Sequence, residues 1–122
     1  MRVKDVLGRF GEDLAARYLT DAGMVILDRN WRCRLGELDI VARDGDALVF
    51  CEVKTRSSVL FGSPAEAVTP AKLARMRQLA LSWLIENREG SPEYWPVLRF
   101  DVVSVLRLRD RPPIIEHLKN VS

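Results

Sequence analysis

The chain has 122 residues, of which 48% are hydrophobic and 30% charged, a composition typical of a globular protein with one domain. The formal net charge is only +2, which excludes a uniformly basic protein that wraps nucleic acid over its whole surface. There is no long uncharged apolar run and no signal-peptide core, so we expect a cytoplasmic protein without a membrane span, with a single domain over residues 1–122.

The first half of the chain predicts one helix and three strands. Apolar residues at helical spacing predict a helix from about Val6 to Asp21, which ends at Gly23. Runs of β-branched and aromatic residues then predict an edge strand and a hairpin, at residues 24–32, 37–42 and 48–54.

The second half predicts one helix and two strands. Thr69 and Pro70 are typical of the N-cap and first position of a helix, and an apolar stripe follows them. Strands are expected at residues 97–106 and 114–118, and loops at residues 57–65 and 89–96. The order of elements predicts an α/β fold, with a central mixed sheet of about five strands flanked by helices.

The hairpin carries a concentration of charge. Side chains alternate between the faces of a strand, so four charged residues share one face and the apolar residues share the other. The charged face would hold Glu37, Asp39, Glu52 and Lys54, and the core face Leu38, Ile40, Val49, Cys51 and Val53.

Two registers of this hairpin are open from the sequence. With Asp44 and Gly45 at the centre of the turn, Glu37 lies opposite Glu52. With the turn centred one residue later, Asp39 lies opposite Glu52 instead.

Either register brings carboxylates together, and their repulsion has to be offset. Two carboxylates at 4 Å repel by about 4 kcal/mol at an intermediate dielectric constant, and Lys54 alone does not balance three acids. Hard oxygen ligands suit Mg²⁺ or Mn²⁺, and a lysine beside such an ion can assist phosphodiester cleavage. An ordinary solvated sheet face explains the same alternation, and the pattern alone leaves both interpretations open.

Basic residues flank this acidic group. Arg32 belongs to a cluster directly before the acidic strand, Arg56 follows Lys54 at strand spacing, and Lys72 and Arg75 lie on the second helix. Such groups suit contact with a phosphate backbone, although a solvated helix face explains the second helix almost as well.

Three other polar or aromatic residues have structural interpretations. Asp101 lies two residues from Arg99 on a strand, which favours a salt bridge over a site. His117 is the only histidine, and we expect it to be structural or exposed. Trp31 suits either core packing or stacking on an exposed base.

The order of acid, turn and Glu-x-Lys resembles the restriction-endonuclease-like, or PD-(D/E)xK, superfamily. The whole chain is similar to the YraN-like family of bacterial predicted endonucleases, which in turn resembles Holliday junction resolvases. The residues that carry the resemblance span nearly the whole chain: Gly8, Gly11, Glu12, Ala15, Leu19, Gly23, Asn30, Trp31, Arg32, Gly36, Glu37, Leu38, Asp39, Phe50, Glu52, Val53, Lys54, Arg56, Phe61, Gly62, Lys72, Arg99, Phe100 and Asp101.

The resemblance implies a restriction-endonuclease-like fold and a nuclease that hydrolyses phosphodiester bonds in DNA with Mg²⁺ or Mn²⁺. It implies that Asp39, Glu52 and the backbone carbonyl of Val53 hold the metal. Lys54 would orient the attacking water, and Glu12 would support the metal from the first helix.

The remaining expectations concern partners. Glu37 has a supporting but undecided role, and Arg32, Arg56, Lys72 and Arg75 are expected to meet phosphates. Resemblance to resolvases implies branched or single-stranded-containing DNA as substrate, and a homodimer. The alternatives are a noncatalytic nucleic-acid-binding or scaffold protein that retains the fold, and a module that binds proteins through a sheet edge.

Overall fold

The computed structural model describes residues 3–57, 68–87, 95 and 97–121, with side chains from residue 6 onward. The loops predicted at residues 57–65 and 89–96 therefore lie, except for Ser57 and Trp95, outside the described residues. The described elements, in chain order, are α1 (Val3–Asp21), β1 (Val25–Cys33), β2 (Gly36–Asp44), β3 (Ala47–Arg56), α2 (Pro70–Glu86), β4 (Val97–Leu106) and β5 (Ile114–Leu118).

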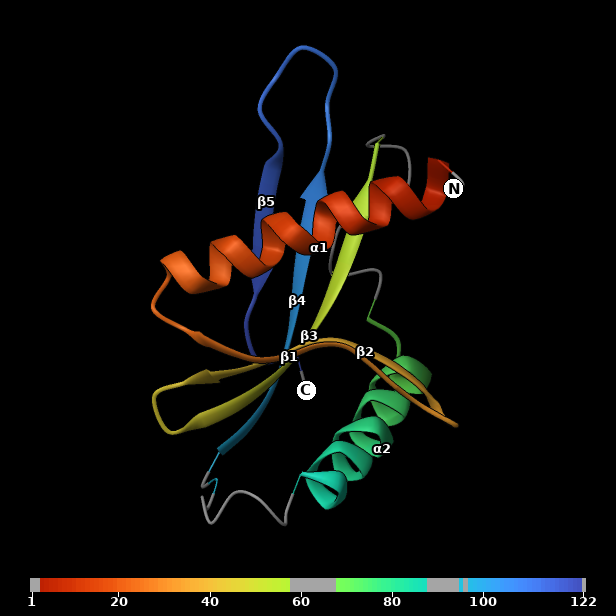
Figure 1. The fold of residues 1–122 in the computed structure, drawn as a ribbon, viewed down its shortest axis with the longest axis vertical. Helices are drawn as coiled ribbons and strands as arrows, with labels where there is room; N and C mark the ends of the chain where they lie inside the picture. The colour runs from red at the N-terminus through yellow and green to blue at the C-terminus, as the bar shows by residue number, and fades with distance from the viewer. Residues whose placement is uncertain (1–2, 58–67, 88–94, 96, 122) are drawn as a thin grey trace.

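The five strands form one mixed sheet in the order β1-β2-β3-β4-β5. The pairs β1–β2, β2–β3 and β4–β5 are antiparallel, and β3–β4 is parallel because α2 lies between them in the chain. Helix α1 crosses the sheet over β3, β4 and β5, and α2 lies beside the β1–β2 end (Figure 1). The predicted α/β class, with a central mixed sheet flanked by helices, is confirmed.

The local signals for the helix ends are confirmed as well. The Thr69 hydroxyl accepts a hydrogen bond from the backbone N–H of Lys72 at 3.1 Å, and Pro70 opens α2. Gly23 follows α1 with a φ of +97°, a left-handed conformation that suits glycine. Of the two described helices, neither has the length and apolar character needed to cross a membrane.

Hydrophobic side chains pack on both faces of the sheet. The α1-side core consists of Ala15, Ala16, Leu19, Met24, Ile40, Ala42, Cys51, Val103 and Val105. The α2-side core consists of Leu38, Val41, Leu48, Phe50, Met76, Leu79, Ala80, Trp83 and Phe100.

These two cores correct the predicted division of the hairpin into a charged face and a core face. Leu38 and Ile40, which were expected to share a face, pack in different cores. The pairing of β2 with β3 ends at Ile40 and Cys51, so β2 is free to depart from regular alternation beyond that point. The face that carries Glu52 is also not a solvated surface, because Phe50 on it is fully buried under α2.

Helix α1 makes an unusually close approach to β3. A Cβ atom placed on Gly11 would lie 1.7 Å from the Thr55 hydroxyl oxygen, so only glycine fits at this position without a shift of the helix. The next residue along α1 is Glu12. The close approach therefore fixes the height of the Glu12 backbone above the sheet.

A second polar network is buried around Asp101 on β4. The Asp101 carboxylate is fully buried and accepts two hydrogen bonds of 3.0 Å from the Arg99 guanidinium. It also lies 2.7 Å from His117 Nε2 and accepts a 3.0 Å bond from the backbone N–H of Asn120. The salt-bridge interpretation of Asp101 is confirmed, and His117 is a buried structural residue with 3% of its side chain exposed.

Candidate metal and nucleic-acid site

The register of the β2–β3 hairpin decides which acids face each other. Asp44 pairs with Ala47, so the turn is centred on Gly45 and Asp46, and Gly45 has a φ of +59°. The pairing runs to Ile40 and Cys51, in the register that, if continued, would place Asp39 opposite Glu52. Of the two registers left open by the sequence, the second is therefore the one observed.

Asp39 lies where the ladder between β2 and β3 ends. Its Oδ2 atom accepts a 2.8 Å hydrogen bond from the backbone N–H of Val53, in the place of a strand carbonyl. This bond holds the Asp39 side chain against β3. Its second carboxylate oxygen stays available for another partner.

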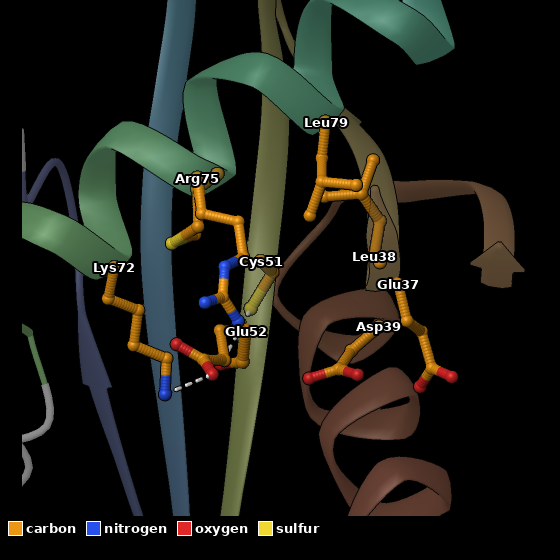
Figure 2. A pocket seen from close by; sticks show the side chains of 10 residues that line it. Glu37, Leu38, Asp39, Cys51, Glu52, Lys72, Arg75 and Leu79 are labelled. Atoms are coloured by element: carbon orange, nitrogen blue, oxygen red, sulfur yellow. Dashed lines mark hydrogen bonds and ion pairs between the residues drawn. The ribbon is translucent and has the colours of Figure 1, made fainter. Parts of the chain in front are cut away.

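Three carboxylates converge at this point from two elements. Glu12 comes from α1, and Glu37 and Asp39 come from β2, and one carboxylate oxygen of each lies within 4.8 Å of the others. Figure 2 shows the carboxylates of Glu37 and Asp39 side by side, next to a helix. The predicted metal-site residues Glu12 and Asp39 are thus brought together, and Glu37, whose role was undecided, completes the cluster.

The cations beside this cluster, Arg32 at Glu37 and Arg29 near Glu12, do not balance the negative charge around Asp39. Burial, together with the charges of Glu12, Glu52 and Glu37, raises the pKa of Asp39 to about 7, although the bond from Val53 opposes the shift. Burial and the charge of Glu37 also raise the pKa of Glu12. A divalent cation would relieve both shifts, because it favours the charged carboxylates.

Glu52 takes a different partner from the other acids. Its Oε1 atom lies 2.5 Å from Nζ of Lys72 on α2, and both side chains are partly exposed, 22% for the acid and 34% for the lysine. Glu52 still raises the pKa of Asp39, so it acts on that group electrostatically. It is not a member of the close cluster formed by Glu12, Glu37 and Asp39.

A cavity of about 260 Å³ connects these groups. It lies between the hairpin and α2, with Glu37, Asp39 and Glu52 on one side and Lys72 and Arg75 reaching in from the helix (Figure 2). Its apolar lining comes from Leu38, Met76 and Leu79 of the α2-side core. We call Glu37, Asp39 and Glu52 the acidic wall of the cavity, and Lys72 and Arg75 the basic wall. The two walls face each other, and much of the lining between them is apolar.

Residues 11–105 of the chain match the family described as "Uncharacterised protein family UPF0102". The chain belongs to this family. A UPF0102 protein of Frankia casuarinae is 56% identical over 119 residues, covering 98% of each chain. One of Streptomyces griseus is 57% identical over 122 residues, covering 100% of each chain, and one of Nocardia farcinica is 57% identical over 118 residues, covering 97% of this chain and 90% of its own.

The other predicted site residues of this UPF0102 chain lie outside the cavity. Lys54 is exposed on β3 and pairs in register with Ser104 of β4. Arg56 donates a 3.3 Å hydrogen bond to the Ser104 hydroxyl. Arg32, with 77% of its side chain exposed, forms a 2.7 Å ion pair with Glu37 and so lies at the edge of the acidic cluster.

Asn30 is a site residue whose role the sequence did not reveal. Its side chain is hydrogen-bonded to Glu12 and lowers the pKa of that carboxyl, against the effect of burial. Its φ of +53° within β1 is a left-handed conformation, which asparagine tolerates better than most residues.

Trp31, the neighbour of Asn30, takes the packing role rather than the stacking role in this structure. Its ring packs against the α2-side core, and its indole N–H donates to Glu86 of α2. This contact ties β1 to the second helix.

Proposed function

We propose that this UPF0102 chain is a metal-dependent nuclease that hydrolyses phosphodiester bonds in DNA. The observation that carries the proposal is the cavity in which Glu37, Asp39 and Glu52 face Lys72 and Arg75. Nucleic-acid phosphate needs cationic partners, and an acidic cluster beside it needs a cation of its own.

The donor set at the acidic wall fits Mg²⁺ or Mn²⁺. Glu12, Glu37 and Asp39 offer carboxylate oxygens within 4.8 Å of one another, which are the hard ligands these ions prefer. The raised pKa of Asp39 reflects charge repulsion that such an ion offsets. When bound, the ion supplies Lewis-acid stabilisation of charge at the phosphate and makes water more acidic.

The remaining residues have the following proposed roles. Lys72 and Arg75 bind the phosphate backbone and orient it over the acidic wall. Val53 holds Asp39 through its backbone N–H and offers its carbonyl as a further metal ligand. Lys54 orients the attacking water or stabilises charge in the transition state, and Arg32 and Arg56 contact phosphates outside the cavity.

The resemblance to restriction-endonuclease-like proteins and resolvases supports this proposal. Asp39, Glu52 and Lys54 lie on neighbouring strands of a mixed sheet with a parallel β3–β4 pair. A central mixed sheet is what the resemblance implies. On the same ground we propose a cytoplasmic protein that acts on branched or single-stranded-containing DNA as a homodimer.

One observation favours a second candidate, a noncatalytic protein that binds nucleic acid. Lys54 is not among the residues that line the described cavity, and Glu52 is already paired with Lys72. A protein with this arrangement would bind DNA through its basic wall and leave phosphodiester bonds intact.

A cleavage assay with a panel of linear, flapped, gapped and four-way-junction DNA, with Mg²⁺ or Mn²⁺, separates the two candidates. The nuclease cuts at least one substrate, and Lys54→Ala lowers the rate by about 10²–10³-fold while retaining DNA and metal binding. Lys119→Ala, a change at another exposed lysine, is the matched control and leaves the rate unchanged.

Two outcomes contradict the nuclease. Purified wild-type protein that binds the panel but cuts none of it is the noncatalytic binder. Cleavage that survives both Lys54→Ala and Asp39→Asn comes from another centre or a contaminant.

A further inference from the structure

The ion pair between Lys72 and Glu52 connects the two walls of the cavity. The 2.5 Å contact joins a lysine on the first turn of α2 to Glu52, an acid of the hairpin that stays out of the close acidic cluster. Figure 2 shows it as the contact drawn across the cavity, with Asp39 and Glu37 further along the acidic wall.

The backbone of Lys72 is fixed, so only its side chain can move. Its N–H donates to the Thr69 hydroxyl at the N-cap of α2, at 3.1 Å. The side chain, by contrast, is 34% exposed and has four rotatable methylene groups. Release of Glu52 therefore needs a rotation of one side chain and no movement of the helix.

The position of Lys72 at the start of α2 favours an anionic partner for its ammonium group. The N-terminal turn of a helix carries a partial positive charge, which disfavours a lysine there and attracts anions. The first turn of α2 contains no acidic residue to offset this. Glu52 supplies the missing negative charge across the cavity, and a phosphate group in the cavity would supply it equally well.

Glu52 likewise has two candidate partners, the Lys72 ammonium and a cation at Asp39. Its carboxylate lies close enough to Asp39 to raise the pKa of that group, so a cation at Asp39 would attract it. The Lys72 ammonium and a divalent cation repel each other, however, so they compete for the same carboxylate.

We infer that the Lys72–Glu52 ion pair is a latch that a divalent cation and a nucleic-acid phosphate release together. A cation alone has to break the pair and leaves Lys72 without an anion. A cation with phosphate gives each released group a new partner, so each ligand tightens the binding of the other. This inference rests on the proposed function and adds that metal and DNA binding are coupled through Lys72.

Calorimetric titration of Mn²⁺ tests the latch, with and without a 12-nucleotide single-stranded DNA whose phosphorothioate linkages resist hydrolysis. In the wild type, we expect the DNA to tighten Mn²⁺ binding by about 5–50-fold, after subtraction of Mn²⁺ binding to DNA alone. In Lys72→Met, Mn²⁺ binding without DNA is tighter than in the wild type by a similar factor, and the effect of DNA is lost.

Arg77→Met is the matched control, because it removes one positive charge from an exposed position of the same helix and Arg77 is not among the residues that line the cavity. Its effect on Mn²⁺ binding without DNA stays within about threefold, as expected for a partly screened charge. Lys72→Arg keeps a cation beside Glu52 and retains the coupling.

The outcomes separate the latch from the proposed function. If Mn²⁺ binds the wild type and Lys72→Met equally well, or more weakly after the change, the latch is wrong and the metal site stands. If neither protein binds Mn²⁺, with or without DNA, the metal site itself is wrong.

Discussion

Asp39 and Asp101 are two aspartates on the same sheet that meet opposite surroundings. Burial disfavours the charged form of both side chains, an effect that by itself would raise the pKa of each carboxyl. Around Asp101, hydrogen bonds from His117, Arg99 and Asn120 outweigh burial and lower the pKa below its ordinary value. Around Asp39, the neighbours are themselves acidic, and the pKa rises to about 7.

The difference separates a structural carboxylate from a candidate site. Asp101 has its compensating cation in the fold, and Arg99 connects it further to Asp44 through a 2.9 Å ion pair. Asp39 has one backbone donor and acidic neighbours, and such a strongly perturbed carboxyl is typical of a functional site. The protein is stable enough to tolerate the repulsion because the rest of the hairpin is buried in two cores.

The largest expected effects are on stability, where matched substitutions at Asp101 and Asp39 should act with opposite signs. Asp101→Asn places an amide N–H₂ among donors and leaves the Arg99 charge, 16% exposed, with the partly exposed Asp44 in place of two carboxylate partners, so stability should fall by about 3–5 kcal/mol. Asp39→Asn keeps an acceptor for Val53 and removes repulsion, so stability at pH 8 should rise by on the order of 1–3 kcal/mol. Urea unfolding followed by tryptophan fluorescence measures both.

For a chain of this length the Asp101→Asn loss corresponds to a decrease in Tm of roughly 10–20 °C. A variant that does not fold at 25 °C agrees with the prediction, provided that Asp39→Asn folds under the same conditions. Equal destabilisation by both substitutions would show that the two aspartates play the same structural role.

The next effect is on the pH dependence of stability. Because the folded pKa of Asp39 is about 7 and its ordinary value is 3.8, the folded protein binds this proton more tightly than the unfolded chain. The stabilisation is fully present below pH 3.8 and is lost as the pH rises through 7. The pKa of Asp101 is lowered, so its contribution has the opposite sign and is lost as the pH falls through the folded value.

The contribution of Asp39 to the unfolding free energy of the wild type should therefore decrease between pH 4 and pH 8. Asp39→Asn should flatten this decrease, and the two curves should converge at low pH. Saturating Mn²⁺ should flatten it as well, because the ion favours the charged carboxylate. A wild-type curve that rises over this range in parallel with that of the variant would contradict the assignment of the shift to Asp39.

The elements of the fold followed from local signals in the sequence. The N-cap at Thr69, the stop at Gly23 and both C-terminal strands lie where apolar periodicity and capping predict them. The hairpin itself followed from its turn residues, but two registers stayed open, and the observed pairing of Asp44 with Ala47 selects the one in which Asp39 would face Glu52. These features depend on residues close together in the chain.

The arrangement of the site depended on tertiary packing, which the sequence could not supply. The pairing of Glu52 with Lys72 depends on how α2 lies against β3, and alternation along a strand does not report that. The separation of Leu38 from Ile40 follows from the end of the β2–β3 ladder, a feature without a residue signature. Metal, DNA and dimer partners stay predictions.

A third prediction concerns the distance between Glu12 and Asp39, which the close approach of α1 sets. Gly11→Ala would place a Cβ atom 1.7 Å from the Thr55 hydroxyl oxygen, so α1 has to shift, at a cost of about 1–3 kcal/mol. Glu12 would move with it, and Mn²⁺ binding should weaken. Thermal unfolding and calorimetric titration check the two effects.

Gly8→Ala is the control on the same helix, since a Cβ there meets no atom within 4 Å. It should stabilise the protein by about 1 kcal/mol through helix propensity and leave Mn²⁺ binding unchanged. If both glycine substitutions stabilise, the contact between α1 and β3 is not limiting, and the position of Glu12 has another cause.

The smallest expected effect is at Asn30, a neutral partner of Glu12 in the acidic cluster. Asn30→Gly keeps the left-handed backbone and removes only the hydrogen bond to Glu12, whereas Asn30→Ala also strains a φ of +53°. Asn30→Ala should therefore be the less stable variant, by on the order of 1 kcal/mol. The Glu12 pKa, measured by NMR titration of its side-chain carboxyl, should rise by the same amount in both variants, because both lose the bond that lowers it. A rise of the Glu12 pKa in Asn30→Ala alone would mean that backbone strain, and not the amide, controls Glu12. The acidic cluster would then lack a side-chain hydrogen-bond partner at this position, in contrast to Asp101 with its several partners.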